Sequence, residues 1–496
     1  MTTYDNNYHI GIVRARNCGK VGYNTLKFVL GEVIMSLQWQ ETAVSALENI
    51  LDTERVSVAE AVRSQHAQDQ SAHQPHLPDV VVWPQNTAEV AAILRYAHEH
   101  EIPVTPWGAG TSIEGNPIPV NGGIVLNLQQ MDKILFVHQN DFQVTVQPGM
   151  FYKDMNKALA AYGLFFAPDP GANASIGGML ANNAAGIRTV KYGATRDNVL
   201  ALEVVLANGD IIRTGSRSIK QSAGYDLTHL FVGSEGTLGV ITEATLKLAP
   251  IPEHYSAATA AFPTVHQAAQ VVFEIIGAGL EPNALELLDE TAVRIINTEP
   301  SINLTPGPNL FMEFSGAGKA NLHEKMKLVE VICHENGCRG YAVGIGHEGR
   351  AQLWEARHRL FEIHLRYYPG QDYLLTDVAV PISAYPRLAA ATADLLEELG
   401  LAGSIISHAG DGNLHTAVFF PPDDDHARQR AADMNKKLVN LAISLSGTST
   451  GEHGVGIGKA QYMAQEHGPA LAVMKQIKQT LDPKGILNPG KIFPES

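Results

Sequence analysis

Two histidines in the last fifth of the chain have the spacing of a metal-binding hairpin. His408 and His415 flank a Gly-Asp-Gly-Asn turn that joins two apolar strands, 404–407 and 416–420. A hairpin would bring the two imidazoles side by side, as a divalent metal requires. Two histidines at a strand edge can also be satisfied by ordinary hydrogen bonds, and for the pair alone this simpler interpretation is preferred.

A third element favours the metal. Glu452 and His453 lie in a glycine-lined turn, Thr-Gly-Glu-His-Gly-Val-Gly. Two histidines and one carboxylate form an open site that leaves room for a substrate. His408, His415 and Glu452 are therefore candidate metal ligands, with a further imidazole beside them.

Several glycine-rich segments could hold a large phosphorylated or planar ligand. In the first, 106–112, glycines would let backbone N–H groups approach a pyrophosphate, and two hydroxyls could add hydrogen bonds. The second, 169–186, is longer and combines two glycine clusters with small and amide residues, and shorter turns of this kind follow at 192–199 and 231–239. The first segment lacks a Gly-x-Gly-x-x-Gly pattern opening a helix, so a Rossmann site is not indicated. A plain turn and a contact between small-residue helices are the structural alternatives.

The first glycine-rich segment follows a predicted strand–helix–strand unit. Residues 79–83 predict a buried strand that a proline ends, and 102–105 predict a second strand. Asn86 or Thr87 can cap the helix between them. The glycine turn would then lie at the end of this unit, which is a common place for a nucleotide.

Strands dominate the region from 123 to 248, and the pattern changes after it. Asn208-Gly209-Asp210 lies between two apolar runs and predicts a hairpin turn. The run 249–252, Ala-Pro-Ile-Pro, predicts a domain boundary. Beyond it, apolar strands alternate with helical patterns, which indicates an α+β second domain.

Composition and charge exclude several classes of partner. The chain has 496 residues, too many for one hydrophobic core, with 36 basic and 51 acidic residues and a formal net charge of -15. This balance argues against nucleic acid and against tight adhesion to anionic membranes, and an anionic substrate would need a local positive site. Three cysteines fit a reducing cytosol, and for Cys333 and Cys338 burial or a turn is preferred to a metal site. No apolar run is long enough to span a bilayer.

The first 34 residues differ from the rest of the chain. Residues 1–34 are Asn-rich and lack periodicity, so we expect a poorly ordered and dispensable extension, with Met35 as a plausible native start. A helical segment and a polar linker are expected over 35–77. The linker contains three histidines for which solvated loop positions are the preferred interpretation: His66, His73 and His76.

Together these motifs resemble, from about 78 to 493, the FAD-dependent D-lactate dehydrogenase (cytochrome)/glycolate oxidase subunit family, which has a vanillyl-alcohol-oxidase (PCMH) type FAD-binding domain. The resemblance implies an α+β fold: a two-subdomain PCMH-type FAD-binding domain, 78–252, followed by a substrate- and metal-binding FAD-linked oxidase C-terminal domain, 253–494. Some relatives attach FAD through a histidine in the first loop. No histidine occurs between 106 and 121, so non-covalent FAD is expected.

The resemblance also implies roles for individual residues. His408, His415 and Glu452 would hold one divalent metal, zinc or manganese, and His453 would be the catalytic base. Arg357, in a Leu-Trp-Glu-Ala-Arg segment that resembles the family's carboxylate-binding segment, would bind the substrate. The implied FAD contacts are Gly108, Gly110, Thr111, Ser112, Pro170, Gly171, Ser175, Gly178, Asn182, Gly186, Gly193, Glu235, Gly236, Gly239, Ile241 and Asn488.

The expected function is metal-assisted oxidation of a small D-2-hydroxy acid, with D-lactate foremost. Glycolate or D-2-hydroxyglutarate dehydrogenase and a non-catalytic flavoprotein electron-transfer subunit are the alternatives. An ether-lipid synthase shares the FAD domain, but the metal ligands disfavour it. Relatives acting on hydroxyglutarate carry an added lysine in the strand resembling 376–381. This chain has Thr376, Asp377 and apolar residues there, so a second substrate carboxylate would meet no cation and could face Asp377.

The expected partners are small. They are the hydroxy acid and an external electron acceptor, which could be a cytochrome, a quinone or an electron-transfer flavoprotein. No nucleic acid and no transmembrane segment are expected, and a homodimer is one option for the assembly. The expected location is the cytoplasm, with peripheral attachment to the inner membrane as an alternative.

Overall fold

The computed structural model describes residues 42–300, 302–345, 348, 351, 354, 355, 357 and 359–494. The predicted extension 1–34 and the start at Met35 lie outside these residues. The chain divides into two compact units, Met1–Val56 and Ser57–Ser496. In the first unit the described residues form a helix over 42–50 and a 3-10 helix, η1 (Thr53–Arg55). All elements below belong to the second unit.

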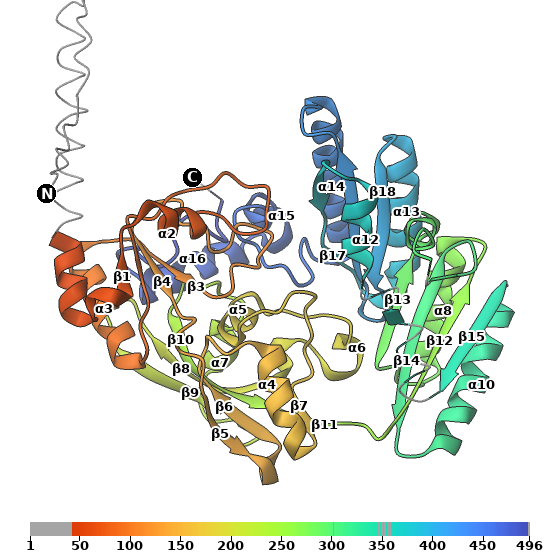
Figure 1. Cartoon of the computed structure of the whole chain (residues 1–496), viewed down its shortest axis with the longest axis horizontal. Coiled ribbons are helices and arrows are strands. Elements are labelled where there is room, and N and C mark those ends of the chain that lie inside the picture. The colour runs from red at the N-terminus through yellow and green to blue at the C-terminus, as the bar shows by residue number, and fades with distance from the viewer. Residues whose placement is uncertain are drawn as a thin grey trace, which may run out of the picture. The chain divides into compact units, whose positions relative to one another are not determined.

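The strand–helix–strand prediction is confirmed. Strands β2 (Val80–Val82) and β3 (Val104–Trp107) both pair in parallel with β4 (Ile124–Asn127), and α3 (Thr87–His100) connects β2 to β3 (Figure 1). Asn86 caps α3, because its side chain accepts a hydrogen bond from the backbone N–H of Glu89 at 3.0 Å. The first glycine-rich segment begins within β3, so this sheet fixes where the segment starts.

His66 in the linker corrects a prediction. It follows α2 (Glu60–Gln65) and is buried, whereas a solvated loop position was expected. Its Nδ1 lies 2.8 Å from the carbonyl oxygen of Val62, and its Nε2 lies 2.9 Å from the side-chain amide of Asn127 at the end of β4. These contacts with the sheet, which the linker sequence does not reveal, explain the burial.

An antiparallel sheet of five strands forms the rest of the region predicted to bind FAD. Its order is β5 (Ile134–His138), β6 (Gln143–Val146), β10 (Val240–Lys247), β8 (Val199–Val205) and β9 (Ile211–Gly215). The predicted hairpin turn is confirmed between β8 and β9, where Gly209 has a φ of +82°. A buried core joins this sheet to short helices. The remaining elements here are α4 (Tyr152–Leu159), β7 (Leu164–Phe165), α5 (Ile176–Asn182), α6 (Thr189–Tyr192), α7 (Leu227–Phe231) and β11 (Ala249–Pro250).

The region after 252 is built on a larger antiparallel sheet, as the α+β prediction requires. Its order is β15 (Gly340–Ile345), β12 (His254–Ala261), β14 (Asn309–Gly316), β13 (Ala284–Leu288), β18 (Ala402–His408), β19 (Asn413–Phe420) and β16 (Asp372–Leu375), with β17 (Val378–Ala379) also paired to β19. One face packs on α8 (Val265–Gly277), α10 (Lys319–Glu335), α13 (Tyr385–Glu398) and α14 (Asp425–Ser444). The other face packs on α9 (Glu290–Ile296) and α12 (Leu360–Tyr367).

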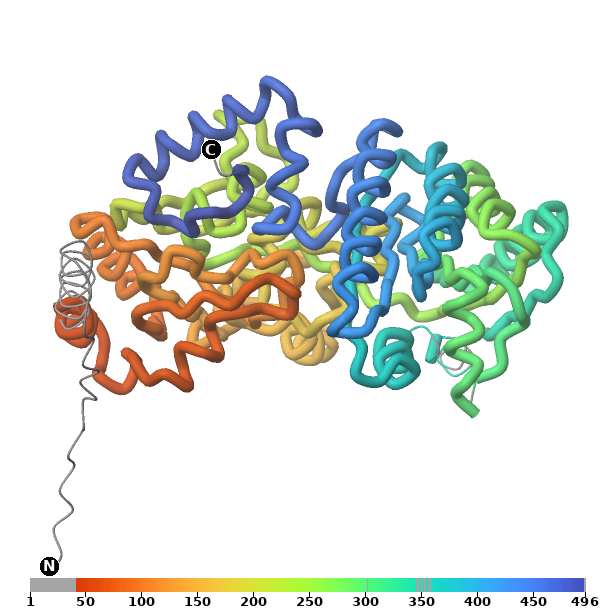
Figure 2. The backbone as a smooth tube through the Cα atoms, turned by 90° about the horizontal axis from the view of Figure 1, so that it is seen from above, coloured from red at the N-terminus to blue at the C-terminus, as the bar shows by residue number. Residues whose placement is uncertain are grey.

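The chain then returns to the FAD-binding region. After α15 (Met463–His467) and α16 (Ala470–Leu481), Leu487 forms a parallel bridge with Val104, and the backbone N–H of Asn488 donates to the carbonyl of Val104 at 2.8 Å. Figure 2 shows this last segment, in blue, beside the orange strands of the first sheet. The tail therefore brings Asn488 to the end of the sheet from which the first glycine-rich segment departs.

Two further predictions concerned the cysteines and the absence of a transmembrane helix. Cys333 is fully buried in α10, and burial raises the pKa of its thiol, so the burial interpretation of this cysteine is confirmed. Within the part of the chain that the structure describes, no helix combines the length and apolarity needed to cross a bilayer.

Candidate active site

A cavity of about 550 Å³ brings most of the predicted residues together. Its walls come from the glycine-rich loops of the FAD-binding region, from the face of the large sheet that carries α12, and from the turn around Glu452. Fourteen predicted FAD contacts line it: Gly108, Gly110, Thr111, Ser112, Pro170, Gly171, Ser175, Gly178, Asn182, Glu235, Gly236, Gly239, Ile241 and Asn488. The predicted metal ligands, His453 and Arg357 line it as well.

Two predicted FAD contacts do not line this cavity. A Cβ on Gly186 would overlap the backbone carbonyl of Asp169, and Gly193 has a φ of +75° with the side chain of Asp197 packed against it. Both glycines are therefore explained by close backbone packing. They shape the loops behind the wall of the cavity.

The glycine-rich segments that line the cavity, called the glycine cradle below, fit FAD because they combine bare backbone with an adjoining cavity. Two of these glycines are also packed closely against the protein's own atoms on their other side. A Cβ on Gly108 would overlap the hydroxyl of Ser175, and one on Gly236, where φ is +69°, would lie 2.8 Å from the ring of Pro106. The glycine-rich segments thus present bare backbone to the cavity, as an approaching pyrophosphate or flavin ring requires. One buried polar atom of a cavity-lining residue, Asn488 Oδ1, has no hydrogen-bond partner among the described residues. It is available to a ligand.

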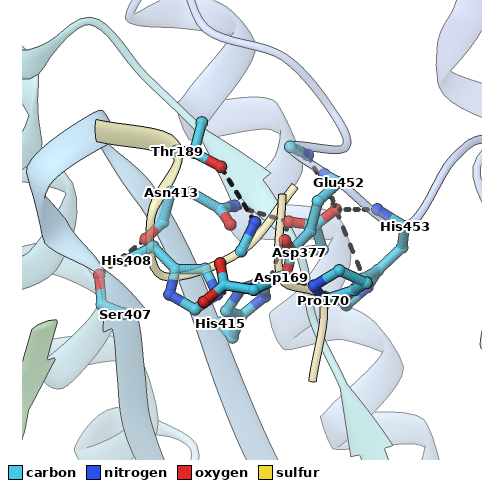
Figure 3. Close-up of polar contacts among 12 residues, drawn as sticks. Asp169, Pro170, Thr189, Asp377, Ser407, His408, Asn413, His415, Glu452 and His453 are labelled. Atoms are coloured by element: carbon cyan, nitrogen blue, oxygen red, sulfur yellow. Dashed lines mark hydrogen bonds and ion pairs between the residues drawn. The ribbon is translucent and has the colours of Figure 1, made fainter. Parts of the chain in front are cut away.

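The candidate metal ligands converge as the hairpin predicts. Strands β18 and β19 pair His408 with Asn413, so His415 lies two residues further along the same face. Glu452 Oε1 lies 3.4 Å from His408 Nε2 and 3.2 Å from His415 Nε2. The three possible ligand atoms all lie within 4.8 Å of one another. Figure 3 shows the two imidazoles and the carboxylate gathered in one place.

Hydrogen bonds on the far nitrogens orient both imidazoles. His408 Nδ1 lies 2.8 Å from Glu286 Oε1, and His415 Nδ1 lies 3.1 Å from the carbonyl oxygen of Thr376. Each acceptor requires the proton on Nδ1, so Nε2 is the nitrogen that faces the possible metal position. Burial lowers the pKa of His408, but Glu286 and Glu452 raise it well above its ordinary value, so a metal bound at Nε2 would replace the second ring proton of this histidine. Glu452 Oε2 is buried without a hydrogen-bond partner among the described residues. The donor set therefore fits a divalent cation such as zinc or manganese.

A second group of side chains is less suited to a metal. Asp377, His415 and His453 also bring possible ligand atoms within 4.8 Å of one another. However, Asp377 Oδ1 already accepts from the Asn413 amide at 2.7 Å, and Oδ2 accepts from the hydroxyl of Thr450 and three backbone N–H groups. Its lone pairs are used, so this carboxylate has little capacity left for a cation.

Asp377 instead fixes the turn that carries Glu452 and His453. Its Oδ2 accepts from the N–H groups of Gly451, Glu452 and His453 at 2.8, 3.0 and 3.1 Å. The side chain is fully buried and does not line the cavity, so the expectation that Asp377 faces the substrate is wrong. Sequence spacing gave no sign that the turn would close over this carboxylate.

Glu235 holds the same turn from the FAD-binding region. Its Oε1 accepts from the N–H of Val455 at 2.6 Å and its Oε2 from the N–H of Gly456 at 2.9 Å. The Asn182 side chain also donates to the carbonyl of His453 at 3.1 Å. The glycine-rich loops and the turn at 451–456 are therefore joined by direct hydrogen bonds.

Arg357 is linked to the candidate metal ligand His408 through Glu286. Its Nε and Nη2 lie 2.8 and 2.7 Å from Glu286 Oε2, and its side chain is 14% exposed. Glu286 thus binds both Arg357 and His408, a role that the sequence interpretation missed. The available signal was a single carboxylate in the otherwise apolar strand Ala-Leu-Glu-Leu-Leu. Of the Leu-Trp-Glu-Ala-Arg segment, the structure describes Trp354, Glu355 and Arg357.

The charge states suit proton transfer. Burial is the largest influence on His453 and lowers its pKa below the ordinary value, although Asp377 acts in the opposite direction. Burial alone would raise the pKa of Glu452, but the neighbouring His408 and His415 hold that pKa well below its usual range. At neutral pH the site therefore contains an anionic ligand and a neutral imidazole that can accept a proton.

Comparison with protein families supports an FAD-linked oxidase. Residues 78–215 match a family described as an FAD binding domain, and residues 251–492 match one described as FAD linked oxidases, C-terminal domain. Two solved structures share the fold. A 4-ethylphenol oxidase from Gulosibacter chungangensis has a TM-score of 0.74, 20% identity, and coverage of 92% of this chain and 97% of its own. A p-cresol methylhydroxylase has a TM-score of 0.72, 17% identity, and coverage of 91% and 96%.

Similarity to curated proteins is higher. A probable mitochondrial D-lactate dehydrogenase of Danio rerio is 41% identical over 458 residues, which cover 91% of this chain and 92% of that protein. A mitochondrial D-lactate dehydrogenase [cytochrome] of Arabidopsis thaliana is 43% identical, covering 84% and 74%. A glycolate oxidase subunit of Bacillus subtilis is 38% identical, covering 91% and 95%.

Proposed function

The chain belongs to the FAD-linked D-lactate dehydrogenase (cytochrome)/glycolate oxidase subunit family, and we propose that it oxidises a small D-2-hydroxy monocarboxylate, D-lactate foremost, with the help of one divalent metal. The observation that carries the proposal is the joint arrangement of five side chains. Three metal-type ligands, a neutral histidine and one arginine line the same cavity as the glycine cradle: His408, His415, Glu452, His453 and Arg357.

Each of these residues has a separate role in the proposed reaction. Arg357 binds the substrate carboxylate; its planar guanidinium has five donors, of which two nitrogens face Glu286. His453 accepts the hydroxyl proton, because its lowered pKa keeps the imidazole neutral near pH 7. A divalent metal on His408, His415 and Glu452 would lower the pKa of the substrate hydroxyl. FAD in the glycine cradle would supply the acceptor for the C2 hydrogen and its electron pair.

A single cation supports the choice of a monocarboxylate. Among the described residues that line the cavity, Arg357 is the only lysine or arginine. Its neighbours on this wall include Leu360, Phe361 and Leu375, and Leu375 ends strand β16 immediately before Thr376. A second substrate carboxylate buried among these apolar groups without a partner would cost several kcal/mol.

The experiment is anaerobic mixing of the purified flavoprotein with D-lactate, L-lactate, glycolate and D-2-hydroxyglutarate at equal concentration, while the flavin absorbance is followed. We expect D-lactate to bleach the flavin fastest. The Leu375→Lys variant, which adds a cation to the apolar wall, should gain rate with hydroxyglutarate relative to D-lactate. Hydroxyglutarate as the best substrate of the parent protein, or L-lactate ahead of D-lactate, would refute the proposal.

Glycolate is the second candidate substrate, because the chain covers nearly all of the Bacillus subtilis glycolate oxidase subunit at 38% identity. The same mixing experiment decides between the two acids.

A non-catalytic electron-transfer subunit is disfavoured, because such a protein needs no substrate arginine or metal ligands. For the external acceptor we propose a cytochrome, since the plant and yeast relatives carry that word in their names. Reduction of a cytochrome by the lactate-loaded protein tests it.

A further inference from the structure

Glu286 is a buried carboxylate between two residues of the proposed site. It lies in the middle of β13, where its side chain is fully buried and the neighbouring residues are alanine and leucines. An ionised carboxylate in such a strand is strongly unfavourable unless every partner is well placed. Its position must therefore be accounted for by its contacts.

Its contacts reach two functional groups at once. His408 Nδ1 lies 2.8 and 3.0 Å from the two oxygens of Glu286, and Arg357 Nε and Nη2 lie 2.8 and 2.7 Å from Oε2. The opposite end of the His408 ring, Nε2, faces Glu452 at 3.4 Å. Both His408 and Arg357 line the cavity. Each of the two therefore contacts Glu286 and also lines the cavity.

We propose that Glu286 is the positioning residue that holds the metal ligand His408 and the substrate-binding Arg357 through one shared buried anion. The proposal rests on the metal and substrate roles proposed above. It goes beyond them because Glu286 itself lies outside the cavity lining and touches neither metal nor substrate.

The backbone around Glu286 is held in place. Leu285 pairs with Met312 on one side, and Leu287 pairs with Leu310 on that side and with Ser407 on the other. Ser407 immediately precedes His408, so Glu286 and its histidine partner come from adjacent strands in fixed register. A carboxylate on this frame has little freedom to move when a partner is lost.

The charge of Glu286 is what allows it to serve two donors. Both oxygens of a carboxylate accept hydrogen bonds, and His408 Nδ1–H and the Arg357 guanidinium are both donors. In Glu286→Gln one oxygen becomes an amide that itself donates, so it opposes one of these two groups. Either His408 would lose the hydrogen bond from its Nδ1, which orients Nε2 toward the metal, or Arg357 would lose the hydrogen bonds from its Nε and Nη2. An aspartate keeps the charge but is one methylene shorter, and it cannot reach both partners from β13.

The test measures binding as well as turnover. The FAD-loaded parent protein and the Glu286→Gln and Glu286→Asp variants are stripped of metal with a chelator and titrated with Zn²⁺ against a competing chelator. Propionate, a carboxylate without a hydroxyl, is then titrated at saturating metal while the flavin spectrum is followed. The matched control is Glu203→Gln, another buried carboxylate with an arginine partner, Arg213 at 2.5 Å, that does not line the cavity.

We expect the zinc affinity of Glu286→Gln to fall about 10- to 100-fold, as for the loss of a metal ligand's outer partner. Propionate binding should weaken by about tenfold, since bidentate guanidinium geometry is disturbed, and KM for D-lactate should rise with it. Glu286→Asp should keep one of the two affinities and lose the other. The control should change neither affinity by more than about twofold, within the scatter of substitutions away from a site.

Three results would overturn the proposal. One is a Glu286→Gln variant, or an aspartate variant if the glutamine variant does not fold, that retains both affinities within twofold. Another is an equal loss of both affinities in Glu203→Gln, which would indicate a general effect of removing a buried charge. The third is a parent protein that binds no divalent metal. A parent protein that binds zinc but does not oxidise D-lactate would refute the proposed substrate, and the zinc titrations would still decide the role of Glu286.

Discussion

The two walls of the cavity are built on opposite principles. The glycine cradle consists of glycine-rich segments, such as 106–112, in which the bare backbone of Gly108 and Gly110 lets a ligand approach closely. The polar wall is formed by His408, His415, Glu452, His453 and Arg357. Two buried carboxylates outside the lining hold it in place: Glu286 contacts His408, and Asp377 accepts hydrogen bonds from the backbone of the turn at 451–453. The cradle is specified by short continuous sequence, whereas the polar wall depends on contacts between distant residues. Damage to the first should remove the cofactor, and damage to the second should remove chemistry while the cofactor stays.

The largest expected effect is on the polar wall, at Glu452. Glu452→Gln removes the anionic ligand, and the loss of a Lewis acid that contributes several kcal/mol should slow flavin reduction about 10³-fold or more. FAD content should not change. Stopped-flow reduction by D-lactate and metal analysis measure the effect. The control is Glu398→Gln, an exposed residue paired with Lys437. Loss of FAD from Glu452→Gln would show that the two walls are not separable.

The next effect concerns the carboxylate that holds the catalytic turn. Asp377→Asn should lower the free energy of unfolding by about 2–3 kcal/mol, because charge-assisted hydrogen bonds from the turn are weakened. It should also weaken metal binding by about tenfold, since Glu452 is no longer fixed. Thermal unfolding and zinc titration measure the two effects. Asp424→Asn, which removes a charge at the cap of α14, should lower stability without changing zinc affinity.

For the glycine cradle we expect the opposite result, a loss of FAD binding. Gly110 and Gly163 share a left-handed backbone, with φ of +68° and +67°, but a Cβ on Gly110 would lie 2.7 Å from the Trp107 ring and one on Gly163 would meet nothing within 4 Å. Both alanine variants should lose about 1–2 kcal/mol of stability from backbone strain. Gly110→Ala alone should weaken FAD binding, by at least about tenfold, because the added methyl group also collides with the Trp107 ring and the loop must move to avoid it. Equal FAD affinity in the two variants would contradict the steric account.

The smallest expected effect is on the pH dependence of the rate of flavin reduction. The base must be neutral to accept a proton, and burial lowers the pKa of His453 below its ordinary 6.5. The rate of flavin reduction should therefore decline with a midpoint below pH 6.5, as the imidazole gains its proton. A pH series of stopped-flow rates with D-lactate tests this. A decline centred above pH 6.5 would mean that another group limits the rate.

The same contrast explains what the sequence could predict. The glycine loops and the His408/His415 hairpin depend on residues near one another in the chain, so spacing and turn chemistry were informative. Asp377 was misplaced because its partners in the turn lie 73 to 76 residues away, and nothing near 377 shows that a turn closes over it. Glu286 was missed because His408 lies 122 residues from it. Gly186 and Gly193 have local reasons for being glycine, which spacing cannot distinguish from contact with a ligand.

The double attachment of the turn at 451–456 has a consequence for the order of assembly. Its amide groups donate to Asp377 and to Glu235, the latter 220 and 221 residues earlier in the chain. Contacts of such long separation form late, after loop closure has been offset by other interactions. The amides of Glu452, Val455 and Gly456 should then gain protection from hydrogen exchange only when both regions have folded and docked. Hydrogen exchange at these amides would therefore report the last folding step, in which the candidate active site is completed.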